Sequence, residues 1–216
     1  ADTGYHLDRC LGCLACTTTC PSGVDYHHLI EIGRERLDAK VPRPLADRLM
    51  RRILAMVIPR AGRFRLMMRL GRIGALFSPV LPKRMRAALA KLPRALPSFD
   101  RVGRKTMTFR SRTKGTRRVI LLAGCAQRAL DPRINASTIR VLNKLGVEVT
   151  VREEAFCCGA LAHHIGDAGA AREAVRATLL SWQEELDKGD VDAIVANASG
   201  CGTMVKDYAH DAGDEP

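Results

Sequence analysis

Four of the chain's eight cysteines lie in the stretch CLGCLACTTTCP, at the spacing C-x2-C-x2-C-x3-C followed by proline. Gaps of two residues allow Cys10, Cys13 and Cys16 to wrap around one cubane 4Fe–4S cluster, while the gap of three turns Cys20 toward a neighbouring cluster. Four thiolates would also suit a structural zinc ion, but zinc sites usually separate their cysteine pairs by a dozen residues or more. The spacing therefore favours iron–sulfur ligation and leaves zinc as the alternative.

The other four cysteines lie in the second half of the chain, and each position follows a predicted strand. Cys125 follows RRVILLAG, Cys157 and Cys158 follow VEVTVR, and Cys201 follows DAIVANA. Residues after the carboxyl ends of parallel strands converge on the crevice where such folds bind ligands. We therefore expect these cysteines to form a second metal-binding set. The alternative is that they are small buried residues, because free cysteine often behaves as a modest hydrophobe.

The elements that must position these cysteines alternate between strands and helices. The three β-rich runs are separated by the helical stretches PRINASTIRVLNKLG and AAREAVRATLLSWQEELDKG. This alternation predicts βαβ units and a parallel sheet, with Trp182 in the core. Upstream, Asp25 in SGVDYHHLIEIGRERLDAK suits the N-cap of a helix that follows the first cysteine run.

Composition places the chain among globular proteins, since 46% of its 216 residues are hydrophobic. No apolar run approaches the roughly 18 residues that span a bilayer. The N-terminal ADTGYHLD has neither the basic nor the apolar region of a secretory signal. We predict a cytoplasmic chain with reduced thiols, where clustered cysteines are more often metal ligands than disulfides.

Positive charge is concentrated in the middle of the chain. From Lys40 to Arg118 there are 23 Lys or Arg and two acidic residues, whereas the rest of the chain carries about −9. PLADRLMRRILAMVI predicts a helix with Leu45, Leu49, Ile53 and Met56 on one stripe and arginines opposite. Prolines interrupt the remainder of this region, and RVGRKTMTFRSRTKGTRR reads as an exposed linker.

This basic middle admits three interpretations. Nucleic-acid binding is disfavoured, because single-strand binders interleave aromatic stacking platforms that are scattered here. Peripheral contact with a membrane suits arginines opposite Leu and Met stripes. The simplest interpretation is a solvated face that docks on an acidic partner subunit. We predict no nucleic-acid partner and leave the other two open.

A few further side chains lie close to the cysteines in the sequence. His163 and His164 follow the CysCysGly motif and could tune or cap a redox site, although histidines on the surface or at helix ends are commoner. Asp167 suits the N-cap of the next helix. Tyr26 and His27 follow the first run and are expected to pack over it.

Four stretches resemble the iron–sulfur subunits of bacterial glycolate oxidases (glycolate dehydrogenases). CLGCLACTTTCPSGVDYHHLIEIGRERL is similar to their second ferredoxin-type run, whereas GCAQRALDPRINASTIRVLNKLGVEV, EEAFCCGALAHHIGD and NASGCGTMVKDYAH are similar to their first cysteine-rich CCG domain. The wider group includes lactate-utilisation iron–sulfur proteins, the small subunit of anaerobic glycerol-3-phosphate dehydrogenase and one of the subunits of heterodisulfide reductase. The sequence ASGC ending at Cys201 favours the glycolate branch.

The resemblance implies an α+β or α/β fold in three parts. Residues 1–39 would be half of a ferredoxin-type 4Fe–4S domain, 40–116 a connector of basic amphipathic helices, and 117–216 the CCG domain with a small parallel sheet. Relatives carry two ferredoxin runs and two CCG domains, so the chain is expected to be truncated at both ends. The missing run would share one or two 4Fe–4S clusters with Cys10, Cys13, Cys16 and Cys20.

The CCG domain would hold one further 4Fe–4S cluster through Cys125, Cys157, Cys158 and Cys201. Several relatives end the CCG motif with C-x-x-C, but this chain has Ala198 three positions before Cys201. Four thiolates rather than five fit one cubane cluster and not the enlarged cluster of the heterodisulfide reductase branch.

The function implied is electron transfer rather than substrate oxidation. No GxGxxG dinucleotide fingerprint follows a strand, no acid–base pair presents itself, and no catalytic residue is expected. FAD-containing subunits of the same complex would oxidise glycolate to glyoxylate, and this chain would pass electrons to a quinone-type acceptor at the inner face of the cytoplasmic membrane. The alternatives are the equivalent subunit for lactate, glycerol-3-phosphate or a heterodisulfide, and, from another class, a zinc-stabilised nucleic-acid-binding module.

Overall fold

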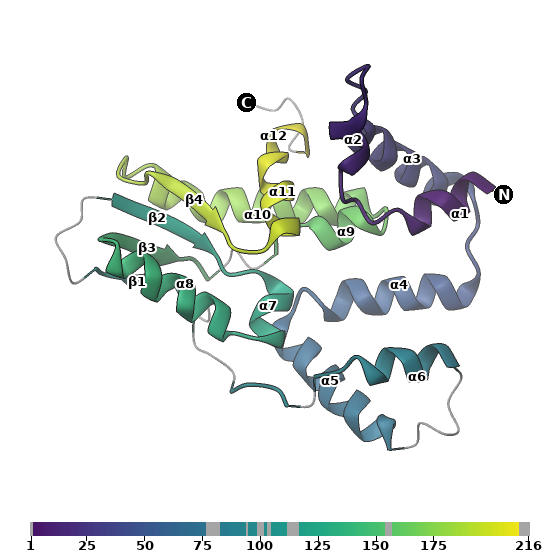
Figure 1. Cartoon of the computed structure of the whole chain (residues 1–216), viewed down its shortest axis with the longest axis horizontal. Helices are drawn as coiled ribbons and strands as arrows, with labels where there is room; N and C mark the ends of the chain where they lie inside the picture. Colours follow the sequence, from purple (N-terminus) through teal and green to yellow (C-terminus); the bar gives the residue numbers. More distant parts are fainter. Residues whose placement is uncertain are drawn as a thin grey trace.

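The computed structural model describes residues 2–76, 83–93, 95–98, 102, 105–111, 117–153 and 157–211. The first cysteine run lies among α1 (Asp2–Arg9), α2 (Ala15–Thr19) and α3 (Tyr26–Lys40). The basic middle contains α4 (Leu45–Val57), α5 (Ala61–Ala75) and α6 (Lys83–Ala90). Figure 1 shows α4 between the N-terminal helices and the α5–α6 pair.

The second half of the chain folds around a small sheet (Figure 1). Its strands β2 (Arg117–Leu122), β3 (Val147–Val151) and β4 (Ala193–Ala196) are connected by α7 (Cys125–Leu130), α8 (Arg133–Lys144), α9 (Ala160–His164) and α10 (Ala168–Leu186), and α11 (Ser199–Lys206) and α12 (Tyr208–Asp211) come after β4. β2 pairs in parallel with β3, opposing Val119 to Val149, and with β4, opposing Ile120 to Ile194. The predicted βαβ units and the α/β fold class are confirmed.

The sheet also contains a strand that the sequence pattern does not predict. β1 (Met107–Phe109) pairs antiparallel with β3, so the order β1-β3-β2-β4 is mixed rather than purely parallel. It lies within residues 101–118, the stretch expected to be an exposed linker, of which 101, 103–104 and 112–116 are outside the described residues. Three residues, the first two of them exposed, are too few to show strand alternation.

Both faces of the central strand are buried. Val119 and Leu121 of β2 belong to one apolar cluster with Ile139 of α8, whereas Ile120 and Leu122 belong to another with Trp182 of α10. A strand covered on both faces reads as a continuous apolar run, as RRVILL does. Trp182 is 1% exposed, which confirms its predicted place in the core.

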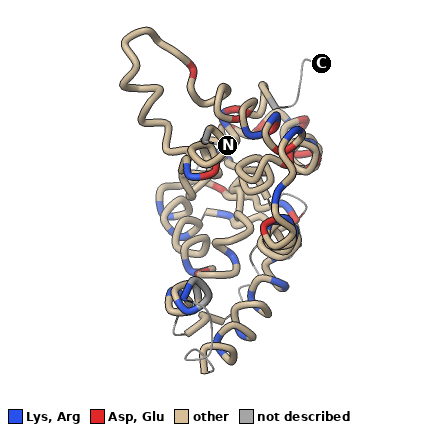
Figure 2. The backbone as a smooth tube through the Cα atoms, turned by 90° about the vertical axis from the view of Figure 1, so that its right-hand side faces the viewer, with Lys and Arg blue, Asp and Glu red and all other residues tan. Residues whose placement is uncertain are grey.

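The basic middle packs on the cysteine-rich half through α5. Ala61 and Met68 contact Ala129 of α7, and the buried guanidinium of Arg65 donates to the Ala129 carbonyl at 2.9 Å. α4 forms as predicted, but its apolar stripe is on the surface, with Leu45 81% exposed. Figure 2 shows Lys and Arg spaced along the helices at the lower end of the molecule. None of the described helices is long and apolar enough to cross a membrane.

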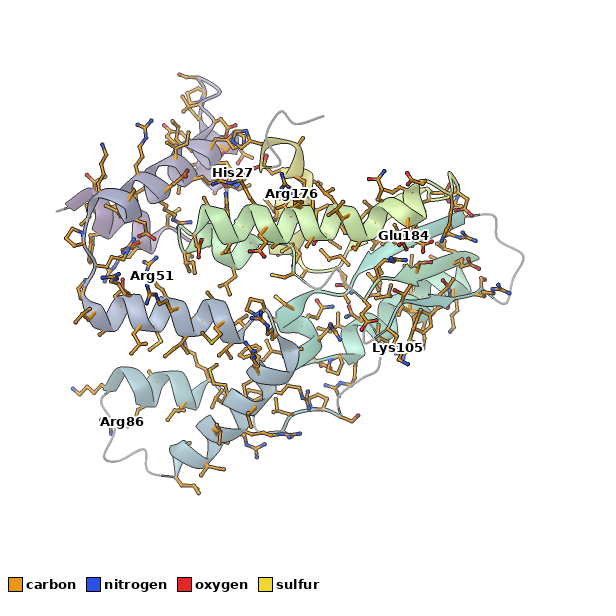
Figure 3. The ribbon with its side chains drawn as sticks, turned by 180° about the vertical axis from the view of Figure 1, so that it is seen from behind. His27, Arg51, Arg86, Lys105, Arg176 and Glu184 are labelled. Carbon is orange, nitrogen blue, oxygen red and sulfur yellow. The ribbon has the colours of Figure 1, made fainter. Side chains whose placement is uncertain are left out.

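Charged side chains attach the N-terminal helices to the rest of the chain. Arg51 of α4 donates to the carbonyl of Ile165 at 2.8 Å and to the Asp8 carboxylate at 3.0 Å (Figure 3). Arg43 contacts both Asp8 and Asp38. These contacts lower the pKa of Asp8, chiefly through the hydrogen bond from Arg43.

Two helix starts agree with the sequence expectation. The Asp25 carboxylate accepts hydrogen bonds from the backbone N–H groups of His27 and His28 at the start of α3. The Asp167 carboxylate accepts from Ala170 at the start of α10. Both predicted N-caps are confirmed, and each fixes where a helix that borders the cysteines begins.

Candidate metal centres

The first cysteine run forms a loop around a small cavity. Gly12 and Leu14 have φ values of 62° and 58°, which reverse the chain before α2. The cavity of about 40 Å³ is lined by Cys10, Cys13 and Cys16 together with residues of α3 and α9. The structure thus brings three thiols of the run to the wall of one small cavity, with Cys13 and Cys16 still exposed to solvent.

A buried cation closes the opposite side of this cavity. Arg34 of α3 is 6% exposed and donates to the backbone carbonyls of Leu7 at 3.1 Å and Cys10 at 2.6 Å. Its guanidinium also lies 3.4 Å from Nδ1 of His164. Burial chiefly, and then the charge of Arg34, lower the pKa of His164. The cavity therefore combines three thiols with the imidazoles of His27 and His164, the Glu31 carboxylate and the buried guanidinium of Arg34.

Cys20 occupies a separate place. It comes directly after α2 and is not among the described residues that line the cavity. Backbone N–H groups of Val24 and Ser22 hydrogen-bond to its sulfur and lower its pKa, and the Tyr26 hydroxyl adds to this effect. The fourth thiol of the run is thus turned away from the other three.

The second set lies where strands end and short helices begin. Cys125 is the first residue of α7 and follows Gly124, whose φ is 67°. Cys157 and Cys158 precede α9, and Cys201 lies in the first turn of α11. Helix N-termini present unpaired N–H groups that favour thiolate over thiol. Four thiols from three connections therefore meet at one edge of the sheet.

Gly159 makes this convergence possible. It caps α9 with a φ of 87°, a conformation that residues with a side chain rarely adopt. A Cβ at this position would also meet the Ala171 carbonyl of α10 at 3.1 Å. The glycine of the CysCysGly motif thus lets the two thiols lie beneath α10.

The four thiols interact as two pairs. Cys125 hydrogen-bonds to Cys157, which lowers the pKa of Cys157 to about 7 with help from the backbone of Gly159. Cys158 likewise hydrogen-bonds to Cys201 and lowers its pKa. The donors Cys125 and Cys158 have raised pKa values, because each lies beside a thiolate and is buried. Two members of the set therefore ionise more readily than the other two, and a soft metal group that displaces the remaining protons would suit it.

The spacing of the sulfur atoms discriminates between kinds of metal. Four thiolates at about 2.3 Å from one zinc ion would lie roughly 3.8 Å from each other. Across the described residues, which include all eight cysteines as free thiols, no three sulfur atoms lie within 4.8 Å of one another. The thiols are thus not drawn together as closely as four ligands around one zinc ion would be.

The remaining residues expected near the site are divided between the cavity and its surroundings. His27 and His164 line the first cavity, whereas His163 contacts Glu31 at 3.3 Å. The sequence pattern does not reveal Arg34, because an arginine in the middle of an amphipathic helix normally points to solvent. Its sequence signal is its spacing of three and seven residues from Glu31 and His27, which line the same cavity.

Comparison with known proteins agrees with this arrangement. Residues 119–206 match the cysteine-rich domain family CCG. The chain is 43% identical over 209 residues to the glycolate oxidase iron-sulfur subunit of Escherichia coli, covering 95% of this chain and 47% of that protein. It is 31% identical over 227 residues to the probable glycolate oxidase iron-sulfur subunit of Bacillus subtilis, covering 100% of this chain and 50% of that protein.

A further relative matches only part of the chain. Lactate utilization protein A of Bacillus thuringiensis is 29% identical over 99 residues, or 46% of this chain and 39% of that protein. No solved structure matches the chain. The chain spans about half the length of the two glycolate oxidase subunits, and its resemblance to them, expected from the motifs, is confirmed. Residues 119–206 thus match the cysteine-rich CCG domain family, and the chain is similar, along about half of their length, to iron–sulfur subunits of glycolate oxidases.

Proposed function

We propose that this chain is the electron-transfer portion of an iron–sulfur subunit in a glycolate oxidase-type complex. The observation that carries the proposal is that Cys125, Cys157, Cys158 and Cys201, from three connections after strands, interact with one another. A separate run supplies three more thiols around one cavity. Two soft-ligand sites in one chain suit a relay of electrons.

The ligand roles are assigned from these positions. Cys10, Cys13 and Cys16 would hold one 4Fe–4S cluster, Cys20 would reach toward a neighbouring one, and the CCG set would hold a further cluster. Such clusters, when bound, accept and release single electrons. The chain's own residues tune them: Arg34 places a positive charge beside the first set, and the N-termini of α7, α9 and α11 surround the second.

The partners belong to the same proposal. FAD-containing catalytic subunits would oxidise glycolate to glyoxylate, and electrons would leave this chain for a quinone or another membrane acceptor. The exposed stripe of α4, with Leu45, Leu49 and Met56 beside arginines, supports peripheral contact at the cytoplasmic face of the membrane or with a partner subunit. The match to lactate utilization protein A makes lactate the second candidate substrate of the complex.

The test begins with the protein purified anaerobically. Iron, sulfide and zinc per chain are measured, and EPR spectra are recorded after reduction with dithionite. We expect iron and sulfide with a reduced-cluster signal, part of which is lost in Cys125→Ser and Cys201→Ser. Thr203→Ala, on the same helix as Cys201, serves as the control and should keep the full signal. Zinc without sulfide after attempted reconstitution contradicts the proposal.

A further inference from the structure

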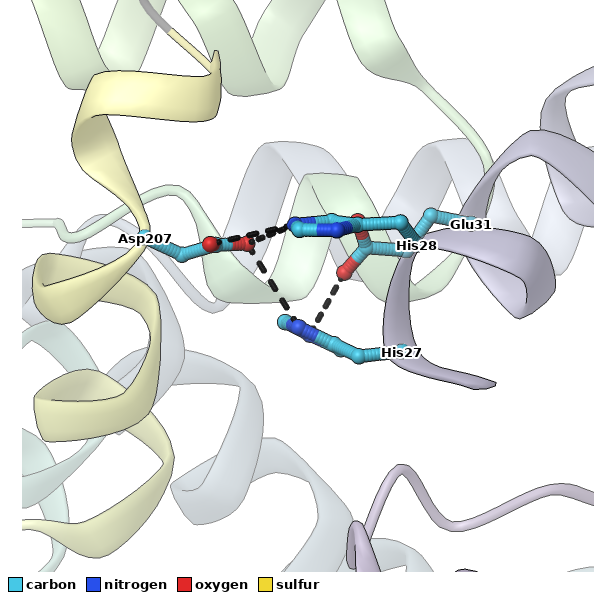
Figure 4. Close-up of side chains that lie close together, drawn as sticks. All are labelled: His27, His28, Glu31 and Asp207. Carbon is cyan, nitrogen blue, oxygen red and sulfur yellow. Dashed lines mark hydrogen bonds and ion pairs between the residues drawn. The ribbon is translucent and has the colours of Figure 1, made fainter. Parts of the chain in front are cut away.

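A group of nitrogen and oxygen ligands borders the first thiol set, since two of its members, His27 and Glu31, also line that cavity. His27, His28 and Glu31 of α3 face Asp207, which lies between α11 and α12 (Figure 4). One ligand atom from each of the four residues lies within 4.8 Å of the others, and the sequence separates the members by up to 180 positions. It is the one cluster of this kind in the described part of the chain.

The distances suit coordination of one ion. Nε2 of His28 lies 3.2 Å from the Asp207 carboxylate, and Nδ1 of His27 lies 3.5 Å from it. His27 Nε2 and the Glu31 carboxylate are 2.6 Å apart. Ligand atoms held at about 2.1 Å from one metal ion lie roughly 3.0–3.5 Å from each other. His27 faces Asp207 through Nδ1 and Glu31 through Nε2, so an ion would take one of these nitrogens, and the four ligand atoms, which lie within 4.8 Å of one another, would adjust around it.

Neighbouring groups orient these ligands. Nδ1 of His28 lies 2.7 Å from the Asp25 carboxylate, which leaves Nε2 directed toward Asp207. His163 of α9 lies 3.3 Å from the Glu31 carboxylate. A carboxylate behind a histidine is the arrangement that fixes the tautomer and ring orientation of metal-bound imidazole. The side chains of the four ligands are only 12–28% exposed, so the ion would be largely shielded from water.

We propose that His27, His28, Glu31 and Asp207 bind a single divalent transition-metal ion that clamps α3 to the end of α11. Two imidazoles with two carboxylates are an N/O donor set suited to ions from manganese to zinc rather than to Mg²⁺ or Ca²⁺. Two carboxylates also balance the two positive charges. The ion would fix the segment that carries the first cysteine run against the cysteine-rich half.

The clamp is tested with Mn²⁺ on the full chain, purified anaerobically. Mn²⁺ prefers carboxylate and imidazole ligands to thiolates, so the cysteines do not compete for it. Loss of the EPR signal of free Mn²⁺ measures binding. We expect one Mn²⁺ per chain and a rise in the melting temperature on Mn²⁺ addition.

Isosteric variants locate the site. Asp207→Asn and Glu31→Gln should each weaken Mn²⁺ binding by more than about tenfold and abolish the thermal shift. Asp25→Asn should weaken binding by roughly 10–100-fold, because it removes only the orienting carboxylate. His6→Ala, which removes an exposed histidine of α1, is the matched control and should bind as the wild type does.

Two results overturn the proposal. One is the absence of stoichiometric Mn²⁺ binding to the wild-type chain, and the other is unchanged binding in both isosteric variants. In either case the four side chains form ion pairs only. Circular dichroism establishes that the variants are folded. Iron and sulfide, measured in the same samples, report separately on the thiol sets, so failure of this clamp is distinguishable from failure of the electron-transfer proposal.

Discussion

Arg34 is the residue that links the first cysteine run to the body of the protein. Its side chain is buried, and its guanidinium donates to the carbonyls of Leu7 and Cys10, on the chain just before the cavity. A buried cation that lines the same cavity as the thiols acts electrostatically as well as structurally, because the low dielectric of the interior screens its charge little.

We expect Arg34→Gln to lower the reduction potential of the cluster held by the first run. Reduction adds negative charge, and the variant removes the positive charge that stabilises it. The loss of charge-assisted hydrogen bonds should also cost about 1–3 kcal/mol of stability. EPR-monitored redox titration measures the first effect. Arg36→Gln, an exposed position on the same helix, should change neither quantity.

The backbone conformation of Gly159 contributes to the stability of the fold. Gly159→Ala should destabilise the fold by about 1–3 kcal/mol, because the backbone has positive φ and the new Cβ meets the Ala171 carbonyl. Gly200→Ala, in α11 with open space around it, should be neutral or slightly stabilising. Urea denaturation compares the two, and equal effects would show that the backbone conformation at Gly159 is not the cause.

At the scale of elements, β3 and α10 are joined by a buried ion pair. Arg152, just after β3, lies 3.2 Å from Glu185 of α10, and Lys188 lies 2.9 Å from the same carboxylate. Burial alone would raise the pKa of Glu185, but the two cations outweigh it and the pKa lies below its ordinary value of 4.5. Stability from this carboxylate is therefore fully present above pH 4.5 and is lost as the pH falls below it.

Glu185→Gln should reduce the free energy of unfolding by about 1–3 kcal/mol at pH 7, since it removes the buried charged partner of Arg152. The difference from wild type should shrink in acid, where the wild-type carboxylate also becomes protonated. Urea denaturation at both pH values measures this. Glu184→Gln is the control: Glu184 contacts the same arginine but is 69% exposed, so its loss should cost little.

The elements themselves were largely predictable, because their signals are local. Three strands, α8 and α10 are predicted by periodicity, and the N-caps Asp25 and Asp167 by single residues at helix starts. β1 was not predicted, because an edge strand of three residues is too short to show alternation of apolar and polar side chains. The grouping of Asp207 with His27 and His28 was not predicted either, because no local sequence pattern links residues about 180 positions apart.

At the scale of the whole molecule, α4 connects the N-terminal helices to the cysteine-rich half. Arg51 does so through one hydrogen bond to the Ile165 carbonyl and one ion pair with Asp8. The sequence marked α4 as a basic amphipathic helix but could not tell which of its arginines would be used in this way.

Arg51→Ala should loosen the attachment of the N-terminal helices. The expected loss is about 1–3 kcal/mol, because two charge-assisted hydrogen bonds disappear. Limited proteolysis of residues 40–44, between α3 and α4, should become faster. Arg52→Ala removes the adjacent, exposed arginine and should leave the rate unchanged. Equal cleavage of both variants would show that Arg51 does not hold the two parts together.

Cys157 and Cys158 are adjacent in the sequence, but each hydrogen-bonds to a different cysteine. These partners determine which disulfides the metal-free protein forms in air. Dioxygen that takes two electrons and two protons from each hydrogen-bonded pair would leave the cross-links Cys125–Cys157 and Cys158–Cys201 rather than a vicinal bond. Non-reducing peptide mapping should find those two links. Every ligand of the set would then be consumed, so a chain exposed to air before it is loaded could accept no cluster until it is reduced. The pairing of the thiols thus requires the cluster to be inserted before the chain is exposed to oxygen.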